Sequence, residues 1–258
     1  MPAAKKPKTK PTPKPKSPRK KTAEIAAVVH ERMSLALPVP RVELDFADAW
    51  QLVIATILSA QSTDKTVNQV TPALFARYPT PAALAAALQE DVEVLVKTTG
   101  FFRNKAKAIR AASQMITERF AGKVPRTIQE VVELPGVARK TANVVLGSAY
   151  RITTGIVVDT HVGRVSRRLK LTRKEDPVDV ETALMKLFPR ESWIDTGHRL
   201  VLHGRYVCTA RAPDCAGCVL NETCASAEAE PTGDWQSRAS SEREKVQGGA
   251  RPATNTPK

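Results

Sequence analysis

Apolar residues recur at spacings of three and four along most of the chain between residues 22 and 206, which is the period of an amphipathic α-helix. Pro and Gly mark short connections between these segments. The pattern predicts an all-α protein, with helices over 22–37, 47–61, 64–77, 81–88, 90–97, 102–120, 127–134, 139–150, 160–170, 178–188 and 197–206.

One internal segment departs from the helical period. Thr153–Asp159 contains the β-branched run Ile156, Val157 and Val158, but no second run stands near it to pair with. We therefore expect a buried extended link between helices instead of a strand.

The two ends of the chain have no such pattern. Residues 1–21 alternate Pro with Lys and hold eight Lys and one Arg without an acid, which predicts a disordered basic arm. Residues 226–258 are rich in Ser, Glu, Gly and Thr and predict a disordered tail. The formal charge of +14 suggests a polyanionic partner such as nucleic acid, although the arm alone would equally suit a solubilising role.

Composition limits the class of protein. With 42% hydrophobic residues the chain can build one or two cores. No apolar run approaches the roughly 18 residues that span a membrane, and the N-terminus lacks the apolar segment of a secretory signal. We expect a soluble intracellular protein without a membrane partner.

All four cysteines stand close together, with the spacing Cys208-x6-Cys215-x2-Cys218-x5-Cys224. Such a short run makes a poor disulfide framework, so a metal or cluster site is the better interpretation. Structural zinc usually takes two close pairs of ligands, and only one such pair is present. Four thiolates suit zinc or an iron–sulfur cluster, and the spacing alone leaves both open.

The segment ELPGVARKTANVVLG, Glu133–Gly147, predicts two helices joined by a Pro-Gly turn. The second helix would point free backbone N–H groups out of the turn, where they suit a phosphate. Such a helix–hairpin–helix can hold a nucleic-acid backbone without selecting its sequence. An ordinary turn between two helices is the alternative.

Arg139 and Lys140 lie at the start of this second helix, where the helix dipole disfavours positive charge. Arg139 would balance a phosphate. Lys140 could do the same, or it could be an amine nucleophile, which must be neutral to react. The helix dipole, the adjacent Arg and partial burial would all favour a neutral amine.

LPGVARKTANVVL, followed by VDTH (Val158–His161) and the cysteine run, resembles endonuclease III, the bifunctional DNA glycosylase and AP lyase branch of the helix–hairpin–helix superfamily. The resemblance covers roughly residues 23–225 and includes LSAQSTD and LHGRYVC. It implies a two-lobed all-α fold that removes oxidised pyrimidines from duplex DNA and cleaves 3′ to the abasic site by β-elimination through a lysine Schiff base. The partner would be double-stranded DNA with damaged bases or abasic sites, bound by a monomer.

The resemblance assigns two catalytic roles. Lys140 matches the lysine that attacks C1′ of the damaged nucleotide, and Asp159 matches the aspartate that assists departure of the base. Asp159 also precedes a predicted helix, so it is equally expected as an N-cap. His161 has a weaker claim and is more often structural.

The resemblance also implies a [4Fe–4S] cluster on Cys208, Cys215, Cys218 and Cys224. The residues expected to contact DNA are Gln61, Asp64, Phe101, Gly136, Ala138, Arg139 and Arg211.

Two positions depart from the family's pattern. Ala138 stands where the family usually has a second hairpin glycine, and we expect the turn to tolerate alanine. Phe101 replaces an aliphatic side chain, which affects substrate range more than chemistry.

We expect a six-helix domain over 42–152 that ends in the hairpin, and a cluster domain made of 22–41 and 153–225. The cell compartment would be the bacterial cytoplasm, in association with the nucleoid, or the nucleus in a eukaryote. A monofunctional relative would lack lysine at position 140. A DNA-binding or iron–sulfur sensor module without catalysis would not need Lys140 together with Asp159.

Overall fold

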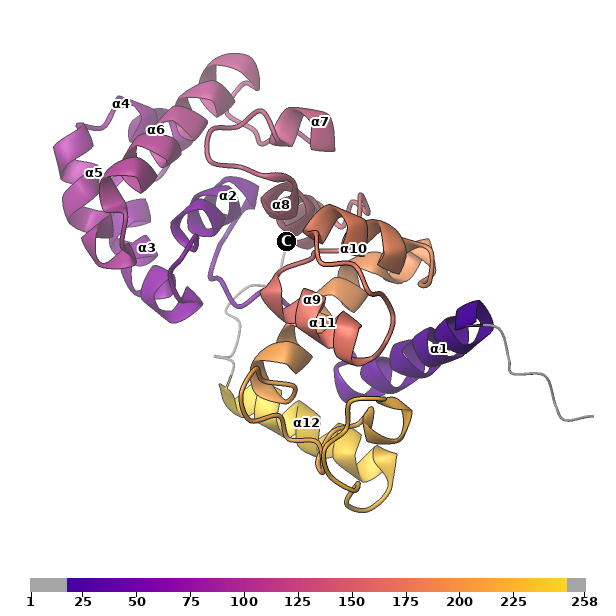
Figure 1. Cartoon of the computed structure of the whole chain (residues 1–258). Helices are drawn as coiled ribbons and strands as arrows, with labels where there is room; N and C mark the ends of the chain where they lie inside the picture. The colour runs from indigo at the N-terminus through magenta and orange to yellow at the C-terminus, as the bar shows by residue number, and fades with distance from the viewer. Residues whose placement is uncertain (1–17, 250–258) are drawn as a thin grey trace, which may run out of the picture.

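The computed structural model describes residues 18–249, which form helices and no strand (Figure 1). The helices are α1 (Pro18–Ala36), α2 (Ala49–Leu58), α3 (Asp64–Arg77), α4 (Pro81–Ala86), α5 (Gln89–Val96), α6 (Phe102–Arg119), α7 (Ile128–Val131), α8 (Arg139–Tyr150), α9 (Thr160–Arg168), α10 (Pro177–Met185), α11 (Trp193–Tyr206) and α12 (Trp235–Gly249). Short 3-10 helices cover Lys97–Thr99, Arg190–Ser192 and Asn221–Thr223. The all-α prediction is confirmed.

The buried apolar side chains form two clusters. The first draws on residues between Leu44 and Leu146, and the second on Ile25–Leu37 together with residues between Ile156 and Val246. Figure 1 shows α3–α7 gathered on one side and α1 and α9–α12 on the other, with α2 and α8 near the middle. The chain passes between the two clusters twice, once before α2 and once after α8.

The second passage is the segment after α8. Thr153–Asp159 has no regular secondary structure, and Gly155–Val158 are buried. The expected buried extended link is confirmed. It ends at Asp159, so this link delivers the predicted catalytic carboxylate to the boundary between the two clusters.

The expectation of a disordered tail from residue 226 is wrong for α12. This helix begins after Asp234, whose carboxylate accepts a hydrogen bond from Ser237 N at 2.7 Å. Its inner face buries Arg238, Ala239, Glu242 and Val246 against the second cluster. The predicted basic arm lies mostly outside the described residues, and α1 begins at Pro18, within the expected arm. Between Pro18 and Gly249 no helix has the length and hydrophobicity that crossing a membrane requires.

Candidate active site

The hairpin adopts the predicted geometry. Backbone of Val137 donates to Leu134 O at 3.0 Å, and α8 begins at Arg139 with Ala138 as its N-cap residue. No side chain caps α8, whereas Asp48 caps α2, Thr63 caps α3 and Asp159 caps α9. The first-turn N–H groups of α8 are therefore free to bind an anion such as a phosphate.

The two hairpin positions Gly136 and Ala138 have different backbone conformations. Gly136 has φ +80°, and a Cβ there would lie 3.2 Å from Ala108 Cβ and 3.3 Å from Ile57 Cγ2. Glycine is thus required at position 136 by conformation and by space. Ala138 has φ −91° and ψ 170°, which any L-residue adopts. The expectation that the turn tolerates alanine at 138 is confirmed.

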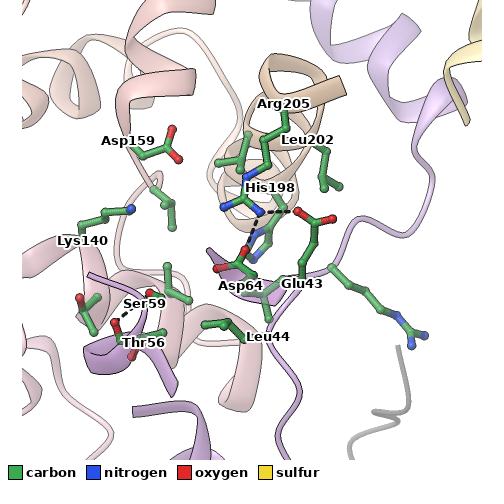
Figure 2. A pocket seen from close by; sticks show the side chains of 16 residues that line it. Glu43, Leu44, Thr56, Ser59, Asp64, Lys140, Asp159, His198, Leu202 and Arg205 are labelled. Atoms are coloured by element: carbon green, nitrogen blue, oxygen red, sulfur yellow. Dashed lines mark hydrogen bonds and ion pairs between the residues drawn. The ribbon is translucent and has the colours of Figure 1, made fainter. Parts of the chain in front are cut away.

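Lys140 and Asp159 line the same pocket, which lies between α8, α11 and the start of α3 (Figure 2). Lys140 comes from the first turn of α8 and Asp159 from the N-cap of α9. The side chain of Lys140 is exposed, so the expected partial burial is wrong for the free protein. Among the described residues no printed hydrogen bond or ion pair holds its ammonium group. A bound polymer could therefore approach this amine directly.

The carboxylate of Asp159 has a fixed direction. Its Oδ1 accepts a hydrogen bond from Val162 N at 2.9 Å, so the predicted N-cap role is confirmed. The residue is half-buried, and Figure 2 shows its carboxylate on the same side of the pocket as Lys140. His161, the weaker candidate, lies 3.2 Å through Nδ1 from Arg164 Nη2, as a structural histidine would.

Arg139 is already engaged within the protein. Its guanidinium donates to both carboxylate oxygens of Glu181, from Nε at 2.8 Å and from Nη2 at 3.1 Å. Asn143 donates to the same carboxylate at 2.9 Å. The hydrogen bond from Glu181 raises the pKa of Arg139, against a smaller opposing effect of burial. Arg139 therefore ties α8 to α10, and its predicted phosphate contact would have to share the guanidinium with Glu181.

Asp64 also lines the pocket but is not free. Its carboxylate accepts from Arg205 Nη1 at 2.5 Å, and the same nitrogen donates to Glu43. The hydroxyl of Tyr206 donates to the other oxygen of Glu43. The pKa of Arg205 is raised because Asp64 and Glu43 outweigh its burial, which acts in the opposite direction. Sequence reasoning missed Glu43 and Arg205 as pocket residues; Arg205 lies in the LHGRYVC motif, and that was the available signal.

His198 is a further pocket residue that the sequence did not indicate. It is fully buried, and its Nε2 lies 3.1 Å from the hydroxyl oxygen of Ser148. Burial lowers the pKa of His198 to about 4, with Arg151 adding to the shift and Asp195 opposing it. The imidazole is therefore neutral at physiological pH, and it joins α11 to α8 behind the pocket.

The two residues expected to fill the gap left by an extruded base, Gln61 and Phe101, share an unusual conformation. Both have left-handed backbones, with φ +53° for Gln61 and φ +46° for Phe101. Both side chains are exposed, and that of Phe101 is 66% exposed. Left-handed non-glycine residues are costly and concentrate at functional sites. This strain accords with the predicted roles of Gln61 and Phe101, which stay predictions.

The four cysteines surround one pocket together with His203 and Arg168. Cys208 Sγ accepts from Arg168 Nη1 at 3.2 Å, and Cys218 Sγ accepts from Leu220 N at 3.3 Å. Burial raises the pKa of Cys208, but hydrogen bonds from His203 and Arg168 outweigh burial and lower it overall. These donors suit anionic sulfur.

The loop that carries the cysteines has irregular backbone whose carbonyl groups are bound by arginines. Arg164 donates to Cys208 O, Arg168 to Thr209 O, and Arg238 of α12 to Cys218 O. Arg211 lies exposed in the same loop, where a contact to phosphate stays a prediction. Within residues 18–249 no three His, Cys, Asp or Glu side chains are grouped as for a single metal ion.

A helix–hairpin–helix with an uncapped second helix, a lysine at its mouth and a carboxylate across the pocket defines a DNA glycosylase of the helix–hairpin–helix class. Residues 54–190 match the HhH-GPD superfamily of base excision DNA repair proteins. The chain is 53% identical to endonuclease III of Synechocystis sp. over 186 residues, 72% of this chain and 85% of that protein. It is 47% identical to endonuclease III of Bacillus subtilis over 188 residues, with the same shares of each chain. The chain belongs to the endonuclease III family, whose members are DNA N-glycosylases with AP lyase activity.

Solved structures agree with this assignment. A trapped covalent intermediate of endonuclease III with DNA matches with a TM-score of 0.75 and 40% identity, over 80% of this chain and 97% of that one. A thermostable thymine-DNA glycosylase matches with a TM-score of 0.69 at 19% identity, over 81% of this chain and 98% of that one, and shares the fold. The predicted family, fold and class of enzyme, a glycosylase and AP lyase acting on oxidised pyrimidines, are confirmed.

Proposed function

We propose that Lys140 is the nucleophile and that Asp159 assists it. The observation that carries this proposal is that both side chains line one pocket, beside the free N-terminus of α8. The neutral amine of Lys140 attacks C1′, and the bond from C1′ to the base breaks with its electron pair leaving on the base. The carboxylate of Asp159 stabilises the positive charge that develops on the sugar.

Strand cleavage follows from the same bond. Loss of a proton from the nitrogen and opening of the sugar leave an imine between Lys140 and C1′. The imine acidifies the C2′ proton, and its removal expels the phosphate at C3′. Water then hydrolyses the imine and returns the free amine.

The test is reduction of that imine by borohydride, which leaves a stable covalent complex. On duplex DNA with an oxidised thymine the native protein should be trapped, and Lys140→Gln should abolish trapping while DNA binding persists. Lys186→Gln is the matched control, since Lys186 is exposed on the far end of α10 and does not line the pocket. Strong trapping by Lys140→Gln would assign the nucleophile to another residue, and no trapping by the native protein would favour a monofunctional glycosylase.

The four thiols are proposed to hold a [4Fe–4S] cluster. The donor set fits, because all four sulfur atoms face one pocket and N–H groups are directed at two of them. The cluster would order the loop that carries Arg211 without taking part in glycosidic cleavage, which moves no electrons. Purified protein should be brown with about four irons per chain; colourless protein with stoichiometric zinc would contradict the assignment.

The partner is proposed to be duplex DNA with oxidised pyrimidines or abasic sites, bound by one copy of the chain. Solved endonuclease III–DNA complexes among the structural relatives support DNA as the partner. The curated relatives compared are bacterial proteins, which favours the bacterial cytoplasm and its nucleoid as the place of action.

A further inference from the structure

We propose that Arg205 binds an oxygen atom of the extruded damaged base and stabilises the negative charge that the base acquires as it leaves. The inference rests on the proposed function, since it assigns a base-binding group to the same pocket. It concerns the carbonyl oxygens that oxidised pyrimidines keep when the ring loses its aromatic character.

The guanidinium of Arg205 is held from two further parts of the chain. Nη1 donates to Asp64, in the first turn of α3, and to Glu43, in the segment between α1 and α2. Tyr206, the next residue of α11, fixes Glu43 from its other oxygen. A group that must bind a base is more effective when its position is set before the base arrives.

Only part of this guanidinium is used by the protein. Arginine has five N–H donors, and the bonds to Asp64 and Glu43 both come from Nη1. Among the described residues no hydrogen bond is recorded for Nε or Nη2 of Arg205, and its side chain keeps 31% exposure. Figure 2 shows the second terminal nitrogen turned toward the side of the pocket where Lys140 and Asp159 lie.

The chemistry of the base matches these donors. An oxidised pyrimidine offers carbonyl oxygens as acceptors beside a ring N–H, and the carboxylates of Asp64 and Glu43 are acceptors for such an N–H. As the bond to C1′ breaks, electron density moves onto the base and its oxygens. Arg205 would then bind the departing base more tightly than the intact one, which accelerates the reaction.

The competing explanation is that Arg205 only ties α11 to α3. An abasic site separates the two, because it has a sugar for Lys140 but no base for Arg205. Arg205→Gln should lower the single-turnover rate of excision of an oxidised thymine by roughly 10-fold to 100-fold, the effect of one charge-assisted hydrogen bond. Cleavage at an abasic site should fall far less.

Arg199→Gln is the matched control. Arg199 lies on the same helix and also binds another segment, donating to Leu37 O at 2.8 Å, but it does not line the pocket. Any loss in this variant should fall equally on excision and on abasic cleavage. Rates are normalised to the fraction of protein that borohydride traps on abasic DNA.

An equal loss of both activities in Arg205→Gln would make Arg205 a structural tie, and unchanged excision would exclude a contact to the base. Either result leaves the proposed function intact as long as the native protein is trapped through Lys140. Absence of trapping in the native protein would instead refute the proposed function.

Discussion

The two hydrophobic clusters bury charge in different ways. Around the first cluster, Lys105 is the buried charged side chain among the described residues; the second buries Arg199, Arg238, Glu181 and Glu242. The first is built from helices that satisfy their own backbone groups. The second encloses the irregular cysteine loop, whose carbonyl groups need donors from elsewhere.

The difference separates two uses of charge. In the first region and at the hairpin, Lys140 and the first turn of α8 keep their polar groups available to a ligand. In the second, arginines and carboxylates are committed to the protein itself. Substitutions in the second region should therefore act mainly on stability.

The largest effect is expected at Arg238, which is 2% exposed and donates to Cys218 O, Thr232 O and Gly233 O. Arg238→Ala should lower the free energy of unfolding by about 3–5 kcal/mol, because it leaves buried partners unpaired. Lys245→Ala, which breaks an exposed pair with Asp214 on the same helix, should cost about 0–1 kcal/mol. Urea titration measures both, and similar small losses would mean that α12 contributes little to holding the loop.

A second effect depends on pH and on His198. The pKa of His198 is about 4 in the folded protein against a model value of 6.5, mainly because burial disfavours the imidazolium. Between these values the unfolded state binds the proton more readily, so the contribution to stability is complete above pH 6.5 and is lost as pH falls toward 4. The loss should reach about 3 kcal/mol. His198→Gln should flatten the difference curve in urea titrations at pH 4.5 and 7.5, and an unchanged slope would contradict the assignment.

The one buried cation of the first cluster gives a smaller prediction. Lys105 Nζ donates to Thr99 O at 2.6 Å, and Lys105 N donates to Phe101 O at 3.1 Å, so this residue supports the loop that presents Phe101. Lys105→Met should destabilise the protein by about 1–2 kcal/mol and increase hydrogen exchange around Gly100. Lys107→Met, exposed on the same helix, should change neither. Unaltered exchange in Lys105→Met would show that the loop holds itself.

The smallest effect is expected at Ala138. Because its φ is negative, Ala138→Gly relieves no strain and only makes the unfolded chain more flexible, which should cost less than about 1 kcal/mol. DNA binding, measured by fluorescence anisotropy, should stay the same. A clear gain in affinity would mean that the alanine side chain crowds the phosphate.

Much of the fold could be predicted from apolar periodicity, since α3 and α8 occupy the predicted ranges. The sequence concealed α12 because two residues of its buried face, Arg238 and Glu242, are charged, and charged residues suggest an exposed segment. Arg205 was missed for a related reason: its partners Glu43 and Asp64 are distant in sequence, so only the folded chain brings the three together. Lys140 and Asp159 were accessible through their motifs.

The corner of the hairpin has one more consequence. At Gly136 the missing side chain lets the turn rest directly on Ile57 of α2 and Ala108 of α6. One of those helices ends just before Gln61, and the other starts just after Phe101. The grip on the phosphodiester and the two probes of the base stack thus form a single rigid gauge, whose spacing along the double helix is set by the absence of one methyl group.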